Sequence, residues 1–272
     1  MPCIALFDSG VGGLSVLSAI QQHIPNADIV YFADHKSSPY GNKDPLWLNT
    51  HIVNLVRELD DHHNLDAIVI ACNTASTLCL EQLRAHIKTP IIGVVPAVKT
   101  AASLSLNQSI GVLATPATIH GQYLKDLITT FASHCQVTTV GSTELVTIAE
   151  NKLNKAAIDQ QILADTIQPF LKAKCDYVVL GCTHFPHLRE DLSALAPHIN
   201  WIDSANAIAK RCASVIANSN IALQTNSSEL HSIFYSSAQI DIGLQETLMT
   251  IGFTDIHPMT QLDKHKLNFS TQ

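Results

Sequence analysis

Two short stretches of this sequence decide the fold: residues 68–74, IVIACNT, and residues 178–184, VVLGCTH. Each is an apolar run of strand-forming residues that is followed by a small residue, a cysteine and polar side chains. A threonine follows Cys72 and Cys182 within two positions. Continuous apolar runs of this length are typical of buried strands in parallel sheets. The recurrence predicts a chain of two similar halves, each of which presents one thiol where a strand ends.

Further apolar runs alternate with stretches of helical length, which is the pattern of βα units on a parallel sheet. Residues 218–228 are polar and weakly patterned, and we interpret them as a connection. The pattern predicts four strands in each half and one strand-like run near the end, at residues 3–7, 28–32, 66–71, 90–94, 109–114, 136–140, 176–181, 199–202 and 229–235.

Helices are expected between these strands and after the last one. The first turn of a helix tolerates proline, so Pro45 and Pro116 support two of the starts. The tail elements are expected to complete the sheet of the first half. We therefore predict an α/β fold of two domains, with residues 1–97 and 205–272 in the first and residues 98–204 in the second. The expected helix starts lie near Gly13, Pro45, Ala75, Ala97, Ala117, Ala156, His187, Ser204 and Ile240.

The composition favours a compact protein without a basic surface that could bind nucleic acid. Of the 272 residues, 46% are apolar and 14% are charged, and the formal net charge is −7. Basic residues form no stripe, so binding to nucleic acid is not expected. No apolar run approaches the roughly 18 residues that span a bilayer, so no membrane association is expected. Residues 1–8 lack the basic region of a signal peptide, and the seven cysteines lack paired spacing. We expect a cytoplasmic protein with reduced thiols.

Polar residues gather where the predicted strands end. Residues 8–10, 34–41 and 72–74 follow the first three strands, and residues 115–118 and 182–184 hold matching places in the second half. Open parallel sheets bind ligands beyond the carboxyl ends of their strands. Two halves that face each other would surround one cleft with these polar groups.

Two thiols in one cleft suit a racemase or an epimerase. Inversion at a carbon that bears a proton needs a base on one face and an acid on the other, and a thiol with an ordinary pKa near ~8.5 can serve as either. We expect the helix N-termini after Cys72 and Cys182 to draw the thiol pKa values toward neutrality. Asp8 and His184 are candidates to tune the thiols. The side chains that suit a substrate carboxylate, together with backbone N–H groups, are Ser9, Asn73, Thr74 and Thr183.

Other motifs favour structural roles. The glycine-rich residues 10–13 lack the third glycine of a dinucleotide loop, because that position is Ser15. Pro186 separates His184 from His187 and no third ligand is apparent, so no metal site is expected. No lysine is singled out for pyridoxal phosphate, and we predict no cofactor. The cysteines interpreted as small buried apolar residues are Cys3, Cys79, Cys135, Cys175 and Cys212.

Four motifs occur in order over residues 7 to about 209: FDSGVGGLSV at 7–16, PYG at 39–41, ACNTAS at 71–76 and LGCTHFP at 180–186. Together they resemble those of the bacterial glutamate racemases, a group of the cofactor-independent aspartate/glutamate racemase family. The resemblance implies two flavodoxin-like α/β domains with parallel sheets, related by a pseudo-twofold axis. It also implies an active site in the cleft between them.

The resemblance implies a role for each matched residue. Cys72 and Cys182 would donate and accept the α-proton, assisted by Asp8, His184 and Glu150. L-glutamate and D-glutamate would be interconverted without a cofactor, and D-glutamate would supply peptidoglycan synthesis. The residues that would hold the substrate are Asp8, Ser9, Tyr40, Gly41, Asn73, Thr74, Thr183 and His184.

The chain departs from the family pattern at two places. Residues 141–150 replace a Cys-Pro-rich segment that many members carry, and with residues 93–97 they resemble a proteobacterial branch. Some members of that branch are activated by a peptidoglycan precursor, and the family tends toward homodimers. Ala117 stands where the family's Thr-x-Gly-Thr pattern has glycine, which bears on the geometry of the turn at residues 115–118.

Two other functions stay open from the sequence. The first is a racemase of aspartate, another acidic amino acid or a hydantoin on the same scaffold, which the side-chain pocket rather than the thiols would distinguish. The second is a non-catalytic regulator that closes on an amino acid. The presence of both cysteines disfavours the regulator.

Overall fold

The structure is a computed structural model that describes residues 1–218 and 231–259. It contains two parallel β-sheets. The strands of the first sheet are β1 (Cys3–Asp8), β2 (Asp28–Ala33), β3 (Ala67–Ile70), β4 (Ile91–Gly93), β9 (Ser232–Ser236) and β10 (Asp255–Pro258). Those of the second sheet are β5 (Ser109–Ala114), β6 (Gln136–Gly141), β7 (Tyr177–Leu180) and β8 (Asn200–Ile202).

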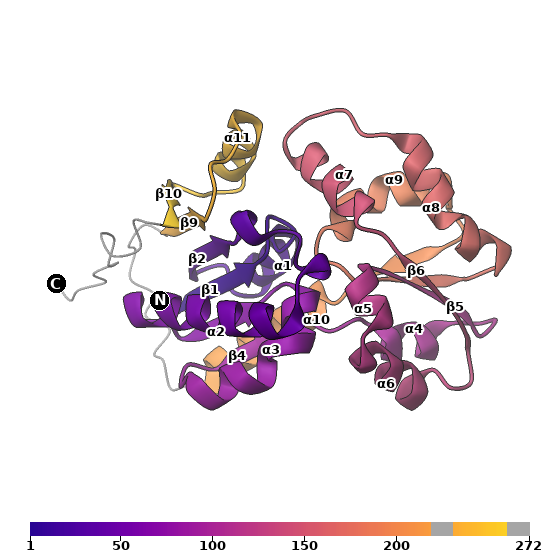
Figure 1. Ribbon diagram of the computed structural model, residues 1–272, viewed down its shortest axis with the longest axis horizontal. Helices are drawn as coiled ribbons and strands as arrows, with labels where there is room; N and C mark the ends of the chain where they lie inside the picture. The colour runs from indigo at the N-terminus through magenta and orange to yellow at the C-terminus, as the bar shows by residue number, and fades with distance from the viewer. Residues whose placement is uncertain (219–230, 260–272) are drawn as a thin grey trace.

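The strand order is repeated between the two sheets. The first sheet runs β10-β9-β2-β1-β3-β4, and the second runs β6-β5-β7-β8. The order β2-β1-β3-β4 therefore recurs as β6-β5-β7-β8, which places β3 and β7 at equivalent positions. This duplication confirms the predicted α/β class with two parallel-sheet halves. Figure 1 shows the two halves side by side, with β9 and β10 in the same half as β1 and β2.

Helices cover both faces of each sheet. In the first half, α1 (Leu14–His23), α10 (Ala205–Asn218) and α11 (Ile242–Thr250) pack on one face, and α2 (Pro45–His62) and α3 (Asn73–His86) pack on the other. In the second half, α7 (Glu144–Leu153), α8 (Gln160–Lys172) and α9 (Arg189–Leu195) oppose α4 (Val98–Leu104) and α6 (Gln122–Phe131). Short helices also occur: α5 (Pro116–His120) and the 3₁₀ segments η1 (His35–Ser37), η2 (Tyr40–Asn42) and η3 (Phe185–Leu188).

Burial on both faces explains the unbroken apolar strands. In β1, Ile4 and Leu6 pack toward α1 and α10, whereas Ala5 and Phe7 pack toward α2 and α3. All four side chains are completely buried. A strand that is covered on both sides has no solvent-facing positions that polar residues could occupy.

The chain passes between the two halves twice. The first passage lies between β4 and α4, and the second lies between β8 and α10. The Ser204 hydroxyl donates a hydrogen bond to the carbonyl of Val95, which ties the two passages together. In the tail, β9 pairs with β2 and β10 pairs with β9, so the described part of the tail extends the first sheet as expected. The polar connection at 218–228 falls almost entirely outside the described residues.

Four elements differ from the sequence predictions. Helix α7 was not expected, and neither was the edge strand β10. The helix expected near Ala156 begins at Gln160, because Asp159 caps it by accepting a hydrogen bond from the Gln161 backbone N–H. The helix expected near His187 is a 3₁₀ turn that continues into α9 from Arg189. None of the described helices is long and apolar enough to cross a membrane.

Candidate active site

Cys72 and Cys182 line the same cavity between the two halves. Cys72 follows β3 and Cys182 follows β7, so the repeated strand order brings equivalent loops face to face. Both thiols are nearly sealed from solvent, at 6% and 7% exposed. The other predicted site residues that line this cavity are Ser9, Tyr40, Gly41, Asn73, Thr74, Thr183 and His184.

Three side chains of the second half form a line that leads away from Cys182. The Sγ atom of Cys182 lies 3.8 Å from Nδ1 of His184, and Nε2 of His184 lies 3.0 Å from Oε1 of Glu150. Helix α7 supplies Glu150, so the unpredicted helix positions a predicted site residue. The His184 side chain is 3% exposed and the Glu150 side chain is 30% exposed.

His184 is held in its charged form. Burial opposes the charge, but hydrogen bonds to Cys182 and Glu150 outweigh it and hold the pKa of His184 well above its usual value. The same bond lowers the pKa of Glu150, despite its burial. An imidazolium donates from both nitrogens, so it bridges the sulfur and the carboxylate. A cation beside Cys182 stabilises negative charge on the sulfur.

Cys72 has the opposite environment. Its Sγ atom lies 3.7 Å from the Ser9 hydroxyl, and it is the N-cap residue of α3. Burial, reinforced by the Asp8 charge, raises the pKa of Cys72 to about 12, although a hydrogen bond from the Ala75 backbone acts the other way. The expectation that the helix N-terminus draws this pKa toward neutrality is therefore wrong for the substrate-free protein. The loss of hydration outweighs the helix dipole at a sealed position.

Asp8 connects the two halves beneath the cavity. Its Oδ2 atom accepts a hydrogen bond of 3.0 Å from the Thr183 hydroxyl, and its Oδ1 atom accepts one of 2.9 Å from the Gly10 backbone. Complete burial raises the pKa of Asp8, and the positive charge of His184 opposes the rise. The carboxylate lies close enough to both Cys72 and His184 to affect their protonation, as the residue type suggested.

The glycines after β1 are required by close contacts with the second half. A Cβ atom on Gly12 would lie 2.5 Å from Nδ1 of His184 and 2.5 Å from the Thr183 hydroxyl. A Cβ atom on Gly10 would lie 2.7 Å from Oε1 of Glu150. A Cβ atom on Gly12 would also lie 2.7 Å from the His184 backbone nitrogen, so Gly12 lets the two halves pack closely, whereas the Glu150 carboxylate beside Gly10 is the end of a flexible side chain that can shift. This accounts for a glycine-rich turn that is not a dinucleotide loop.

The structure adds site residues that sequence reasoning did not single out. The Tyr40 hydroxyl donates to Asp34 at 2.9 Å, and His51 lies 2.7 Å from the same carboxylate. Hydrogen bonds from His51 and Tyr40 overcome the effect of burial and lower the pKa of Asp34. Thr115 also lines the cavity, with its hydroxyl 3.5 Å from that of Thr74. Asp34 and Thr115 both lie in the polar clusters that follow predicted strands, and this position in the sequence could have identified them as site residues.

The structure also shows the surroundings of Gly41, Ala117 and His187, which the sequence analysis discussed. A Cβ atom on Gly41 would meet Thr115 at 3.3 Å, so this glycine allows η2 to approach α5. Helix α5 forms with Ala117 in place of the family's glycine. His187 donates from Nε2 to the Gly12 carbonyl at 3.0 Å. Within the described residues, no group of three or more His, Cys, Asp or Glu side chains could hold a metal ion.

Comparisons with known proteins place this geometry in a family. The model of the Asp/Glu/Hydantoin racemases matches residues 14–212. The chain belongs to this racemase family. A glutamate racemase of Shewanella loihica (strain ATCC BAA-1088 / PV-4) is 43% identical over 251 residues, which cover 92% of this chain and 93% of the relative. A second, of Shewanella sp. (strain ANA-3), is 40% identical over 268 residues, which cover 96% and 98%.

Solved structures of glutamate racemases share the fold of this racemase-family chain. The enzyme of Escherichia coli, in complex with L-glutamate and the activator UDP-MurNAc-ala, superimposes with a TM-score of 0.87 at 36% identity, covering 94% of this chain and 97% of that one. The enzyme of Francisella tularensis, in complex with D-glutamate, gives a TM-score of 0.78 at 26% identity, covering 97% and 99%.

Proposed function

We propose that this member of the racemase family is a glutamate racemase that interconverts L-glutamate and D-glutamate by proton transfer between two thiols. The observation that carries the proposal is the shared cavity of Cys72 and Cys182, which are supplied by equivalent strand ends of two facing sheets. Inversion needs a base and an acid on opposite faces of Cα. Relatives named glutamate racemase, at about 40% identity over nearly the whole chain, support the substrate.

The protonation states assign the starting roles. The raised pKa of Cys72 keeps that residue a thiol, so Cys182, which lies beside the charged His184, is the first base in our proposal. In one direction Cys182 removes the α-proton and Cys72 delivers a proton to the other face. The bond from Cα to hydrogen breaks on one side and a new one forms on the other, with a carbanion between them. In the other direction the two cysteines exchange roles.

We propose that the substrate is held by groups around the thiols. The backbone N–H groups at the start of α3, with the side chains of Asn73 and Thr74, suit a carboxylate. Ser9 of the first half and Thr183 of the second half also line the cavity and offer hydroxyls. Tyr40 contributes its ring, because its hydroxyl is bonded to Asp34, and Gly41 offers backbone. Asp8, His184 and Glu150 assist the proton transfers.

The wider role follows from the product. We propose that D-glutamate from this reaction supplies peptidoglycan synthesis in the cytoplasm, without a cofactor. The Escherichia coli relative was solved with UDP-MurNAc-ala, which is described as its activator. We propose that the same class of precursor activates this chain, and that the chain forms a homodimer. The domain limits of 1–97 with 205–272, and 98–204, are part of the proposal.

The test is the exchange of the α-proton for deuterium. In D₂O, the full-length chain should incorporate deuterium at Cα from both L-glutamate and D-glutamate, and circular dichroism should show the loss of optical rotation. Incubation with and without UDP-MurNAc-ala measures activation. Aspartate in place of glutamate should give no comparable signal. Faster inversion of aspartate would contradict the substrate assignment, and tight binding without exchange would support the regulator instead.

A further inference from the structure

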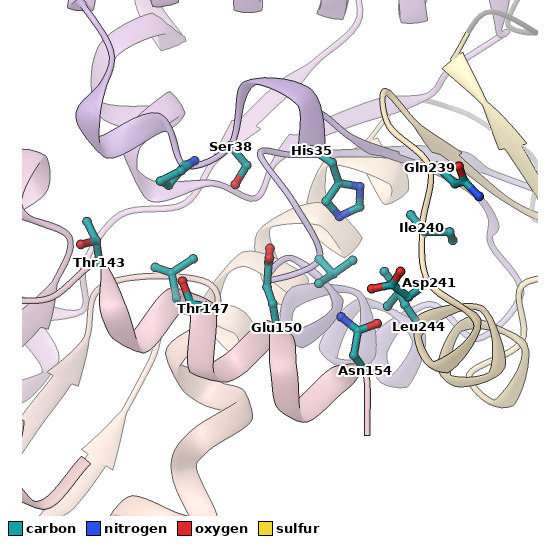
Figure 2. Close-up of a pocket in the computed structure, with 13 residues that line it drawn as sticks. His35, Ser38, Thr143, Thr147, Glu150, Asn154, Gln239, Ile240, Asp241 and Leu244 are labelled. Atoms are coloured by element: carbon teal, nitrogen blue, oxygen red, sulfur yellow. The ribbon is translucent and has the colours of Figure 1, made fainter. Parts of the chain in front are cut away.

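The segment between β2 and α2 separates two pockets. Ser38 lines an outer pocket that α7 also borders (Figure 2). Tyr40 and Gly41 line the cavity of the two thiols, and Pro39 lines both pockets. At this residue a single stretch of chain therefore stands between the two spaces. We call residues 34–41 the cavity wall, because a shift of this segment changes the shape of the substrate cavity.

A buried carboxylate holds the inner end of the cavity wall. The Asp34 side chain is 2% exposed, and its Oδ2 atom accepts a hydrogen bond of 2.9 Å from the Tyr40 hydroxyl. The backbone N–H of Asp34 donates to the Asp8 carbonyl at 3.0 Å, which ties the wall to the end of β1. A buried charge needs hydrogen bonds to remain in place. The position of Tyr40 therefore depends on what else holds the Asp34 carboxylate.

His51 of α2 supports this carboxylate and the cavity wall together. Its Nε2 atom lies 2.7 Å from Oδ2 of Asp34 and 3.0 Å from the Ser37 hydroxyl. An ionised carboxylate only accepts hydrogen bonds, so Nε2 carries a proton and donates it. Ser237 bonds to the same carboxylate. Burial raises the pKa of Asp34, and of the hydrogen bonds that lower it overall the one from His51 has the largest effect.

Trp47 keeps the His51 ring in this position. The two residues are four positions apart on α2, so their side chains lie on the same face of the helix. Their rings are stacked, with 4.7 Å between the centroids and 12° between the planes. Trp47 is 48% exposed, and this stacking accounts for a large aromatic side chain at the surface. The contacts therefore run without a break from Trp47 through His51 and Asp34 to Tyr40.

We propose that His51 is a positioning residue for the substrate: it fixes the Asp34 carboxylate, and Asp34 holds the wall of the substrate cavity. The inference rests on the glutamate racemase function proposed above. The Tyr40 hydroxyl is occupied by Asp34, so the Tyr40 ring and the Gly41 backbone are the parts that face the substrate. Both parts move when the carboxylate moves.

The thiols are held by other contacts. Cys72 lies against the Ser9 hydroxyl, and Cys182 lies against His184. Neither contact includes a residue of the cavity wall. Loss of His51 should therefore weaken the binding of glutamate and leave the proton transfers intact, which raises KM at an unchanged kcat.

Three substitutions of His51 separate its hydrogen bond from its bulk. We expect His51→Ala to raise KM for glutamate about tenfold, as for the loss of one hydrogen bond to a charged group, and to change kcat by less than about twofold. His51→Phe keeps a ring beside Trp47 without a donor and should raise KM equally. His51→Gln keeps a donor near the position of Nε2 and should retain most of the affinity. His62→Ala, at the opposite end of the same helix, is the matched control and should leave both constants unchanged.

A double variant shows whether His51 acts through Tyr40. Tyr40→Phe removes the hydroxyl that bonds to Asp34, so it should also raise KM. Both substitutions act through one carboxylate, so the rise in the double variant His51→Ala/Tyr40→Phe should be smaller than the product of the two single rises. A purely structural role of His51 would give independent effects that multiply.

The experiment measures initial rates by circular dichroism for KM and kcat, and calorimetry for the affinity of each variant for glutamate. Thermal melting checks that each variant is folded at the assay temperature. Unchanged KM and affinity in His51→Ala and His51→Phe, binding by His51→Gln as weak as theirs, or effects that multiply in the double variant would overturn the role of His51. Absence of racemisation in the unmodified chain would instead overturn the proposed function, and the affinities would still test the positioning role.

Discussion

At the scale of single residues, the proposed chemistry depends on one imidazolium held between a sulfur and a carboxylate. His184 lies 3.8 Å from the Cys182 sulfur and 3.0 Å from Glu150, and it is completely enclosed. The residue types and their order along the chain were enough to nominate Cys72, Cys182 and His184. Their protonation could not be predicted, because the loss of hydration at Cys72 depends on how the two halves close.

Replacement of His184 tests this electrostatic arrangement. We expect His184→Asn to lower kcat/KM by about 100-fold, because the sulfur loses the cation that stabilises its charge and general acid–base groups contribute at about this level. The loss must be equal from L- and D-glutamate, since the equilibrium constant of a racemisation is one. Initial rates by circular dichroism from both enantiomers provide the measurement. A loss of less than about threefold would show that the thiolate does not depend on His184.

At the scale of secondary structure, the strands were the most predictable elements. β5 (Ser109–Ala114) has the predicted bounds, and β1 extends the prediction only by Asp8. Burial on both faces makes such strands visible as apolar runs. Strand β10 was not visible because it is a four-residue edge strand with partly exposed, polar positions. Helix α7 was not recognised because its residues were interpreted only as a motif around Glu150.

The end of helix α2 carries a buried titratable group, His63. It is 4% exposed, its ring lies 5.7 Å from that of Tyr235, and neither ring nitrogen has a hydrogen-bond partner among the described residues. Burial lowers the pKa of His63 to about 4. The folded state therefore binds fewer protons than the unfolded state below pH ~6.5, and stability falls as the pH drops toward 4.

We expect this effect to cost about 2 kcal/mol at pH 4.5 relative to pH 7, from the difference between the folded and unfolded pKa values. The His63→Phe variant has no titratable group at this position. Its free energy of unfolding should therefore fall less between pH 7 and pH 4.5 than that of the parent protein, by about the same amount. Urea unfolding at the two pH values measures the difference. If the variant and the parent lost equal stability, His63 would be protonated in the folded state at no cost in free energy, which would contradict the prediction.

At the scale of the whole molecule, α11 of the first half packs on the end of α7 of the second. Thr247 donates to the Leu153 carbonyl at 2.7 Å, and Lys155 pairs with Glu246 at 2.5 Å. A Cβ atom on Gly243 would lie 2.3 Å from the Asn154 carbonyl oxygen, so this contact needs glycine within a helix. The contact anchors the helix that carries Glu150.

Substitution of Gly243 tests whether the contact between α11 and α7 affects the closing of the cleft between the two halves. Gly243→Ala favours α11 by up to about 1 kcal/mol through helix propensity, but its methyl group pushes α7 away. Because the methyl group would meet backbone atoms of Asn154, we expect a lower melting temperature together with a several-fold rise in KM for glutamate. Ile242→Ala, at a position that is 74% exposed on the same helix, should leave KM unchanged. An unaltered KM in Gly243→Ala would mean that the contact plays no part in closing the cleft.

The duplication of the whole molecule was predictable, but the way in which the halves meet was not. The similarity of residues 68–74 and 178–184 indicated two matching strand ends, and the strand orders repeat as that similarity suggested. The contacts of Gly10 and Gly12 with Glu150, Thr183 and His184 join residues that are far apart in the chain. A single sequence holds no signal for such distant pairs beyond the residue types themselves.

The most direct measurement of the central claim uses the two single variants Cys72→Ser and Cys182→Ser. Each should keep the fold and lose racemisation, because one face of Cα is left without its acid or base. Each should still eliminate HX from a halogenated glutamate, one variant from one enantiomer only and the other variant from the opposite enantiomer. Racemisation at a near-normal rate in either variant, or elimination from both enantiomers by the same variant, would contradict the assignment of one thiol to each face.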